Sequence, residues 1–589
     1  MSDAHLLITE NIDVWTTAIK KRSATGRGSN KKIELTGIKK LRELILELAV
    51  RGKLVPQDPN DEPASVLLEK IVAEKAQLIK DKKIKKPKVL PEIGEDKKPF
   101  ILPSGWEWDY LSDLCILENG DRSKNYPNKS LLVESGIPFV NAGHLQGGRV
   151  DKNAMTFITS ERFELLRSGK FINGDILYCL RGSLGKAALV EDFHNGAIAS
   201  SLIIIRFFKM ISSKLMLNYF ASPLASAMIR TYDNGTAQPN LSAADLGKFL
   251  VPIAPLAEQC RIVEKVDELM GLCDQLEHQT EDSITAHKTL VESLLATLSN
   301  SETPAEFNQN WARIAEHFDT LFTTEHSIDQ LKQTVLQLAV MGKLIPQNPN
   351  DEPASVLLEK IAAEKEQLIK DKKIKKQKPL PVISDDEKLF ELPNGWEWER
   401  IAEFTIVGTG STPSRATPEY YNPADINWVT SGETGGDFIF ETKEKISPKA
   451  IKETNVSIYP AGTLIVAMYG QGKTRGQITE LMIDAGTNQA CAAIRLIDKS
   501  AGHRKYTKLY FQKAYKELRS HSAGGAQPNL NVGKISLTVL PIPPLDEQHR
   551  IVKKVDKLMT LCDQLKARLN EAQTTQLKLA NTIVDQTVN

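Results

Sequence analysis

Residues 59–86 read PNDEPASVLLEKIVAEKAQLIKDKKIKK, and residues 349–376 repeat this stretch with 26 of 28 residues identical. A second block, residues 252–277 with the sequence PIAPLAEQCRIVEKVDELMGLCDQLE, returns at 541–566 with 19 of 26 residues identical. The offsets are 290 and 289 residues, so the chain is written twice. Near-identical elements tend to pack in equivalent environments, as the subunits of a symmetric dimer do. The repeat therefore predicts an approximate twofold axis within one chain.

The repeated blocks have the residue spacing of helices. Apolar residues recur at intervals of three and four over 38–48 and 328–338, with Gly52 and Gly342 at the positions of helix C-caps. Pro63 and Pro353 suit the first turn of a second helix in each half.

The last repeated element has the clearest stripe, with apolar residues spaced by four and three over 262–276 and 551–565. It predicts a spacer helix over about 257–280, 24 residues long, or about 36 Å. Such a helix either lies on its own domain or pairs with its twin, antiparallel if the twofold axis holds.

Two segments of matching length but different sequence, 105–250 and 395–540, lie between the repeated blocks. Each contains a short strand-like run, at 175–180 or 463–468, that is preceded by a glycine and followed by a glycine-rich loop. These features predict a mixed α/β fold for both variable domains, joined by long helices that pair as an antiparallel coiled coil. The predicted organisation is an N-terminal helical region (1–104), a first variable domain (105–250), a spacer helix (251–300), a central helical region (301–394) that repeats 38–104, a second variable domain (395–540) and a C-terminal spacer helix (541–589).

The composition excludes several classes of protein. Lys and Arg number 75 against 74 Asp and Glu, so any surface that binds nucleic acid must be local. Six cysteines lie far apart without a C-x-x-C pair, which argues against a disulfide framework or a zinc ribbon. No apolar run approaches the ~20 residues that span a bilayer. We therefore expect a reduced, cytoplasmic protein that does not enter a membrane.

Several motifs together resemble a known family. Gly-Trp-Glu-Trp begins at residues 105 and 395, and Gln-Pro-Asn-Leu at 238 and 527. Pro-Ile-x-Pro-Leu-x-Glu-Gln-x-Arg-Ile-Val begins at 252 and 541. In this order and in duplicate, they resemble the specificity subunit of type I restriction-modification enzymes. The duplicated Leu-Ala-Val-x-Gly-Lys-Leu block, at 48 and 338, is similar to the branch called type IB, or AI-like.

This resemblance implies a function in DNA recognition for phage defence. In the family, two target recognition domains each read one half of a split site on double-stranded DNA. The conserved helices form an antiparallel spacer and dock two methyltransferase subunits, which bind S-adenosylmethionine and methylate adenine. Restriction subunits use ATP, with Mg, to translocate DNA before cutting. The resemblance therefore implies that this chain binds no cofactor and is not an enzyme.

Catalytic alternatives rest on weak motifs. Residues 467–474, AMYGQGKT, match a relaxed phosphate-loop pattern, which would indicate a P-loop nucleotidase. The equivalent loop 181–187, RGSLGKA, lacks the hydroxyl residue, so a flexible loop near a DNA backbone is the better interpretation. A fused adenine methyltransferase would require Asn-Pro-Pro-Tyr, whereas residues 422–425 read Asn-Pro-Ala-Asp. A scaffold for helical partners that does not bind DNA remains a third alternative.

Candidate DNA contacts are polar residues on loops at which the two halves differ. Arg and Lys can pair with guanine, Asn and Gln with adenine, and Glu with cytosine. The candidates in the first domain are Arg122, Lys124, Asn125, Tyr126, Asn141, His144, Gln146, Arg181, Ser183, Lys186, Gln238 and Asn240. Those in the second domain are Ser411, Thr412, Arg415, Thr430, Ser431, Glu433, Gln471, Lys473, Arg475, Gln527 and Asn529.

Each candidate also has a structural alternative. Any one of them can be a solvated loop side chain or a residue that stabilises a turn. Gln-Pro-Asn-Leu is identical in both halves, so it is expected to position the backbone rather than to specify sequence. The lysine runs at 80–88 and 370–378 are either solvated helix ends or contacts to phosphate or to a partner.

Overall fold

The computed structural model describes residues 9–21, 33–84, 86, 89–153, 155–233, 235, 239–470, 473–520 and 530–588. The chain forms two compact units. The first holds the chain up to Ile284 and again from Glu571, and the second holds Thr285–Asn570.

Twin helices precede the variable domains. α3 (Thr36–Val50) is repeated by α13 (Glu325–Val340), and α4 (Ala64–Lys80) is repeated by α14 (Ala354–Lys370). Gly52 and Gly342 have φ of +68° and +69°, the left-handed conformation in which glycine closes a helix, so the predicted C-caps are confirmed. Pro63 and Pro353 lie one residue before α4 and α14, outside the first turn that was predicted for them. The shorter elements are α2 (Ile12–Thr17), β1 (Lys20–Lys21), β2 (Ile33–Glu34), α11 (Pro304–Glu316) and α12 (Phe318–Leu321).

Each half contributes one long helix, α10 (Leu256–Ser299) or α19 (Leu545–Val588), and each has 44 residues. The predicted length of 24 residues is therefore wrong. Polar residues at 280 and 287 interrupt the apolar stripe, so the sequence pattern does not show that the helix continues beyond them. At about 1.5 Å per residue, 44 residues extend about 66 Å. The stripe resumes with buried residues Val291, Leu295 and Leu298.

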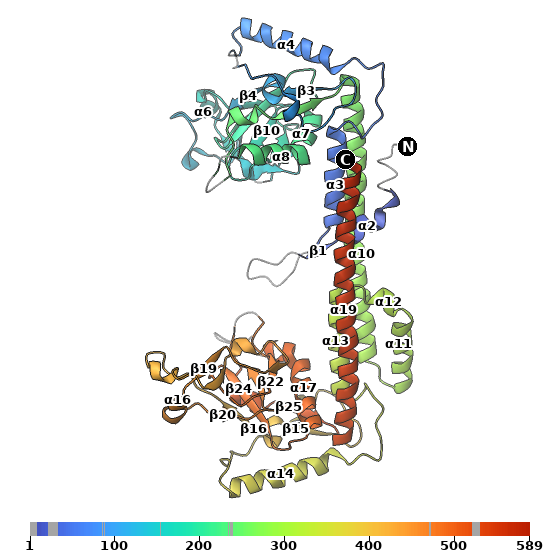
Figure 1. Ribbon diagram of the computed structural model, residues 1–589, viewed down its shortest axis with the longest axis vertical. Coiled ribbons are helices and arrows are strands. Elements are labelled where there is room, and N and C mark those ends of the chain that lie inside the picture. Colours follow the sequence, from blue (N-terminus) through green and yellow to red (C-terminus); the bar gives the residue numbers. More distant parts are fainter. Residues whose placement is uncertain are drawn as a thin grey trace. The chain divides into compact units, whose positions relative to one another are not determined.

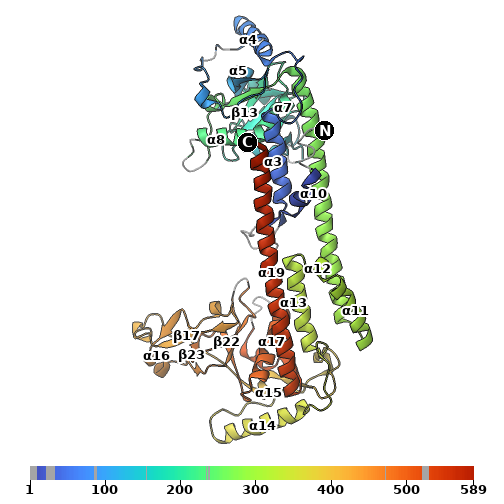
Figure 2. The same ribbon diagram turned by 45° about the vertical axis from the view of Figure 1, so that its right-hand side comes forward.

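In the first unit, α3 packs with the first part of α10 and the end of α19 (Figures 1 and 2). The guanidinium of Arg42 in α3 lies 2.7 Å from the carboxylates of both Asp274 and Glu277 in α10. Beyond the other end of α3, Lys53 donates to the carbonyl of Val588 in α19 at 3.0 Å.

The second unit repeats this bundle with α13, the beginning of α19 and the end of α10. Lys566 of α19 donates to Asp329 of α13 at 2.9 Å. Lys343, after α13, donates to the carbonyl of Ser299 at the end of α10 at 3.1 Å. Each bundle thus combines the beginning of one long helix with the end of the other, which is the arrangement of an antiparallel pair.

The first variable domain is a mixed α/β fold on two sheets. Its strands are β3 (Glu107–Tyr110), β4 (Cys115–Asn119), β5 (Ile137–Val140), β6 (Leu145–Gln146), β7 (Arg149–Val150), β8 (Thr156–Ile158), β9 (Lys170–Ile172), β10 (Ile176–Cys179), β11 (Ala187–Leu189), β12 (Asn195–Ile198), β13 (Leu202–Phe207) and β14 (Leu250–Ile253). Its helices are α5 (Leu111–Leu114), α6 (Ser160–Leu165), α7 (Ser213–Ala221), α8 (Pro223–Tyr232) and α9 (Ala243–Leu246). The sheet orders are β4-β13-β10-β11-β7-β6 and β8-β5-β12-β9, and β3 pairs separately with β14.

The second variable domain has the same layout. Its strands are β15 (Glu397–Arg400), β16 (Thr405–Thr409), β17 (Ile426–Val429), β18 (Phe438–Ile439), β19 (Glu444–Ile446), β20 (Ile458–Tyr459), β21 (Leu464–Ala467), β22 (Ile478–Leu481), β23 (Ala485–Thr487), β24 (Cys491–Leu496) and β25 (Val539–Ile542). Its helices are α15 (Ile401–Phe404), α16 (Pro448–Glu453), α17 (Ala501–Ser520) and α18 (Val532–Ser536). The sheet orders are β16-β24-β21-β22-β18 and β19-β17-β23-β20, and β15 pairs with β25.

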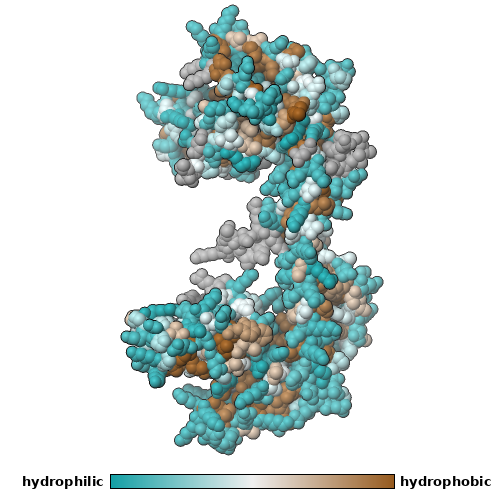
Figure 3. Space-filling view, in the orientation of Figure 1, coloured by the Kyte–Doolittle hydropathy of each residue, from teal (hydrophilic) through white to brown (hydrophobic). Residues whose placement is uncertain are grey.

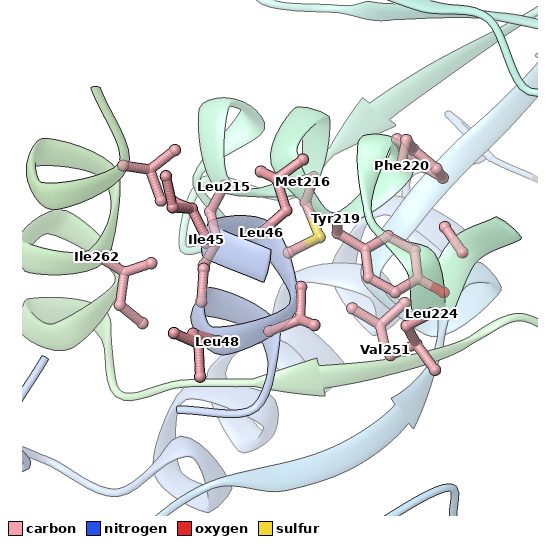
Figure 4. Close-up of a cluster of buried hydrophobic side chains, with 14 of the residues drawn as sticks. Ile45, Leu46, Leu48, Leu215, Met216, Tyr219, Phe220, Leu224, Val251 and Ile262 are labelled. Atoms are coloured by element: carbon pink, nitrogen blue, oxygen red, sulfur yellow. The ribbon is translucent and has the colours of Figure 1, made fainter. Parts of the chain in front are cut away.

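Apolar side chains connect the bundle to the variable domain in each unit. Figure 4 shows this core in the first unit, where Ile45 and Leu46 of α3 lie between Ile262 of α10 and Met216 of α7. The burial of these apolar side chains away from water is the main contribution to the free energy that holds the bundle and the variable domain together. The face of the molecule in Figure 3 is mostly hydrophilic, as expected when the apolar residues are used in the core.

A polar network gives the repeated Gly-Trp-Glu-Trp motif the same structural role in both halves. The indole of Trp106, from the Gly-Trp-Glu-Trp motif, donates to Glu258 of α10 at 3.0 Å, and Gln57 donates to the same carboxylate at 2.8 Å. Trp396 donates to Glu547 at 2.9 Å in the second unit. The motifs therefore fix the junction between each variable domain and its long helix.

Candidate nucleic-acid interface

Three strands of the first domain end around one turn, residues 199–201 between β12 and β13. The amide of Ala199 donates to the carbonyl of Val140 at the end of β5 at 2.7 Å, and Leu180, after β10, donates to the carbonyl of Ser201 at 2.9 Å. Gly120 follows β4, and a Cβ there would lie 2.8 Å from the carbonyl oxygen of Ala199. Three of the loops that carry candidate residues therefore start at the same edge.

The same edge exists in the second domain around residues 488–490. Asn488 donates from its amide to the carbonyl of Val429 after β17 at 3.0 Å, and Met468 donates to the carbonyl of Ala490 at 2.8 Å. A Cβ at Gly410, after β16, would lie 1.6 Å from the carbonyl oxygen of Thr487. Close backbone approach thus requires glycine at the start of the first loop in both domains.

The first loop of the first domain begins at a carboxylate that organises it. Asp121 is buried and accepts from the amides of Ser123 and Arg167 at 2.5 and 2.6 Å. Burial opposes its ionisation, but these hydrogen bonds from amides outweigh that effect and lower the pKa of Asp121. The side chains of Arg122 and Lys124 are exposed on this loop.

Two further candidates on this loop are partly buried. The Asn125 amide donates to the carbonyl of Leu165 at 2.9 Å, and the ring of Tyr126 packs on Phe139 with centroids 5.9 Å apart. These contacts fix the end of the loop and leave Arg122 and Lys124 as its accessible cations.

The second loop is closed by its own polar residues. Asn141 accepts from the amide of Gly143 at 2.8 Å, and the Nδ1 atom of buried His144 accepts from the amide of Asn141 at 3.1 Å. Gln146 is exposed beyond them. In the second domain, Glu433 accepts from the amide of Thr430 at 2.7 Å and from that of Lys443 at 2.8 Å.

A histidine in the first domain and a glutamate in the second therefore build the same structural feature. His144 and Glu433 both close a capping box around a single turn of 3₁₀-helix, η3 (Ala142–His144) or η6 (Ser431–Glu433). Ser431, inside η6, accepts through its carbonyl from the hydroxyl of Thr434.

The glycine loop of the first domain packs beside the Gln-Pro-Asn-Leu turn. Arg181 donates from Nε to the side chain of Asn240 at 3.1 Å, and the amide of Gly182 donates to the carbonyl of Pro239 at 3.2 Å. Hydrogen bonds from the amides of Asn240 and Gly235 lower the pKa of Asp233 and hold the turn. The side chains of Ser183 and Lys186 are exposed. Gln238 lies outside the described residues.

The first loop of the second domain is held by different partners. The carbonyl of Ser411 accepts from the indole of Trp428 at 3.2 Å, and the hydroxyl of Thr412 donates to Gln489. Arg415 pairs with Glu444 at 2.5 Å and lies over the ring of Tyr421. Gln489 is exposed and was not among the sequence candidates, because it lies in the turn between two strands, where no motif marks it.

The glycine loop of the second domain leads from β21 into β22. A phosphate loop requires a helix N-terminus after its lysine, and here a strand follows, so the P-loop alternative finds no support. Lys473 is exposed, while its carbonyl accepts from the hydroxyl of Tyr515 at 2.5 Å. The carbonyl of Arg475 accepts from Arg519 at 3.1 Å. Gln471, Gln527 and Asn529 lie outside the described residues.

Across the parts of the chain that the structure describes, no group of three or more His, Cys, Asp or Glu side chains could hold a metal ion. None of the helices in those parts is both long and apolar enough to cross a membrane.

Comparison with known proteins agrees with this architecture. Residues 103–286 and 393–573 each match the family model described as the type I restriction modification DNA specificity domain. The EcoEI and EcoAI specificity subunits of type I restriction enzymes from Escherichia coli are each 40% identical to this chain, with 99% of both chains covered in either comparison. The EcoKI specificity subunit, from E. coli strain K12, is 26% identical over 46% of this chain and 50% of its own. The chain therefore belongs to the type I restriction-modification DNA specificity family, on the EcoAI-like branch, and carries the family's domain twice.

Proposed function

We propose that this chain supplies the DNA sequence specificity of a type I restriction-modification complex and catalyses no step itself. Each variable domain reads one half of a bipartite target on double-stranded DNA. The observation that carries the proposal is the shared loop edge around residues 199–201 and 488–490. One backbone frame there presents different polar side chains in the two domains, which is what two readers of unlike sequences require.

Exposure and hydrogen bonding divide the candidates into two groups. Side chains that are exposed on the edge are assigned to DNA, and those whose polar atoms are used within their own loop are assigned to positioning. The first group is Arg122, Lys124, Ser183, Lys186, Thr412, Arg415, Lys473 and Gln489. Gln146 is exposed but also donates to the carbonyl of Gly143 in its own loop at 3.3 Å, so it combines both features. The second group is Asn125, Tyr126, Asn141, His144, Asn240, Thr430 and Glu433.

A few candidates combine both features. Arg181 is exposed and also anchors Asn240, so it fixes the glycine loop while its remaining donors face outward. Ser411 and Ser431 each hold their loop through a backbone carbonyl, which leaves the hydroxyl for DNA. Arg475 is partly buried, and its carbonyl accepts from Arg519, so it is assigned to positioning.

The helical bundles are the proposed docking surfaces for partner subunits. Because the two bundles are built from equivalent helices, they suit two copies of one partner, a methyltransferase subunit that binds S-adenosylmethionine. Restriction subunits that use ATP and Mg complete the complex. Under this division of labour the S-adenosylmethionine, ATP and metal sites belong to the partners, and the complex works on DNA in the cytoplasm.

Exchange of one domain tests the proposal. Residues 105–250 are replaced by the corresponding domain of another family member, and methylated adenines are mapped across the genome of a host that carries the complex. Only one half of the methylated site should change. The matched control replaces residues 395–540 and should change the other half alone. Changes in both halves from either exchange would refute independent reading.

A further inference from the structure

The two halves differ at one buried position next to the variable domain. Arg400, at the end of β15, is 3% exposed. Its guanidinium donates to the carbonyl of Pro381 at 2.8 Å and that of Leu537 at 2.7 Å, and makes two hydrogen bonds of 2.9 Å to the carboxylate of Glu387. A single arginine therefore holds the segment 381–387 against the domain.

The first half lacks both members of this ion pair. With the offset of 290, Tyr110 takes the place of Arg400 and Lys97 that of Glu387. An open cleft of about 700 Å³ lies here, between the segment 90–102 and strand β3. Pro91, Glu92 and Tyr110 all line it, and they correspond to Pro381, Val382 and Arg400. The cleft thus includes the counterparts of Arg400 and of the two residues of segment 381–387, Pro381 and Val382, whose carbonyls the guanidinium contacts.

The wall of the cleft has the chemistry of a cation site. Aromatic rings from Phe100, Trp106, Trp108 and Tyr110 line it, and the rings of Phe100 and Trp108 lie 5.0 Å apart. Aromatic faces attract cations, and guanidinium groups stack on them. The guanidinium of Arg51 already lies over the ring of Phe100, 4.4 Å from its centroid, so a further cation would use the other rings of the wall.

Carboxylates complete the wall. Two of its acids are already paired, because Asp113 lies 2.6 Å from Lys75 and Glu95 lies 2.5 Å from Lys98. Glu92, Glu107 and Asp109 also line the cleft, so its charge is negative without an added cation. Burial raises the pKa of Asp109 to about 6, a penalty that an incoming cation would relieve.

We propose that this cleft binds the guanidinium of an arginine side chain from a partner subunit. The partner would supply to the first half the group that Arg400 supplies within the second half. An arginine fits better than a lysine because, in the second half, the planar guanidinium reaches three carbonyls and a bidentate carboxylate at once. The inference rests on the proposed function only in that it requires a protein partner.

A small arginine derivative tests the site directly on the purified full chain. N-acetyl-arginine methylamide should give saturation-transfer NMR signals, and the neutral isostere N-acetyl-citrulline methylamide should give none. The double variant Tyr110→Arg with Lys97→Glu rebuilds the ion pair of the second half and should weaken binding of the arginine probe at least about tenfold, or about 1.4 kcal/mol. Equal binding by citrulline, or by the double variant, would overturn the site.

A second variant tests the site independently, in case the double variant does not fold. Asp109→Asn keeps the shape and the hydrogen bond from the amide of Tyr110 but removes the charge, so it should also weaken binding of the probe. Circular dichroism verifies the fold of each variant. An Asp109→Asn chain that binds the probe as tightly as the parent would count against the site.

The source of the arginine is tested by assembly. The double variant should bind its methyltransferase subunits about tenfold more weakly, while the DNA sequence that it selects stays the same. Unchanged assembly would overturn the assignment to a partner, even if the probe binds. Failure of the proposed function would appear instead in the domain exchange, which does not involve the probe.

Discussion

The first and second variable domains share their strand order but differ at one edge of the larger sheet and in the helices that cover it. The order β4-β13-β10-β11-β7 in the first domain corresponds to β16-β24-β21-β22-β18 in the second. The first domain adds β6 beyond this order. Its covering helix breaks at Ser222, which caps α8, and Pro223, which occupies the first turn, whereas α17 continues for 20 residues.

This difference teaches which parts of the fold are constrained. The strands at the centre of the larger sheet, such as β10 and β21, are buried at every residue, whereas the one added strand, β6, lies at the edge of that sheet. Sequence differences are accommodated where burial is incomplete, at the loops and at the sheet edges. The surface that reads DNA can therefore diverge between the halves without disturbing either core.

The largest expected effect tests whether the two junctions are energetically equivalent. Trp106→Ala and Trp396→Ala should each destabilise their own unit by about 4 kcal/mol, because each removes a buried indole and takes one of two side-chain donors from a buried carboxylate. Hydrogen exchange measured by mass spectrometry reports the two units separately. The control is Trp311→Ala, which removes a ring that is 36% exposed and should cost much less. If only one unit were strongly destabilised, the two junctions would be equivalent in structure but not in their contribution to the free energy of unfolding.

A smaller effect should be confined to the second half. Arg400→Ala should destabilise that unit by about 3 kcal/mol at pH 7, because buried acceptors lose their donor, whereas Lys97→Ala in the first half should have little effect. The hydrogen bond from Arg400 lowers the pKa of Glu387 from 4.5 to about 2. The part of the effect that comes from the ion pair is complete above pH 4.5 and is lost as the pH falls toward 2, so the gap between parent and variant should narrow in acid. It should not close, because the hydrogen bonds from Arg400 to backbone carbonyls do not depend on pH. Amide exchange over 381–400 as a function of pH measures it, and a constant gap would contradict the ion pair.

The smallest effect separates backbone contacts from base contacts in each domain. Lys186→Ala and Lys473→Ala should weaken binding to all DNA sequences, and each should flatten the salt dependence by about one unit of slope. Gln489→Ala, on the same edge, should instead change the preference among sites. His144→Ala and Glu433→Ala should reduce specific binding through loss of loop geometry. Fluorescence anisotropy on specific and random duplexes measures all five, and a sequence-dependent loss from either lysine would contradict the division.

Repetition made most of the fold predictable. Two copies of each motif revealed the twin helices, and the glycines that close them were identified because few residues adopt a left-handed conformation. The length of α10 was not predictable from its stripe, since Thr280 and His287 occupy positions where an apolar residue would have signalled continuation. Both polar side chains are compatible with the helix because each has a hydrogen-bond partner: Thr280 donates to the carbonyl of Leu276 at 2.7 Å, and His287 contacts the carbonyl of Thr320.

The candidate interface was only partly predictable. Loop composition identified the right segments, but it could not tell an exposed arginine such as Arg122 from a histidine such as His144, which closes its own loop. That distinction depends on whether a backbone amide of the loop points at the side chain, as the amide of Asn141 points at His144. The role of the turn at 488–490 was hidden for a related reason, since its importance comes from three strand ends that are distant in sequence.

The exchange of helix ends between the two bundles sets an order of events during synthesis. The last part of α19 contributes buried Ala580 to the core of the first unit, and Leu577 and Val584 pack against that core. A ribosome that has made the first 284 residues has therefore made almost all of this unit except one wall of its helical bundle. That wall emerges only after the whole second unit has been translated. The half of the molecule that is made first must wait, with part of its apolar surface uncovered, for the half that is made last.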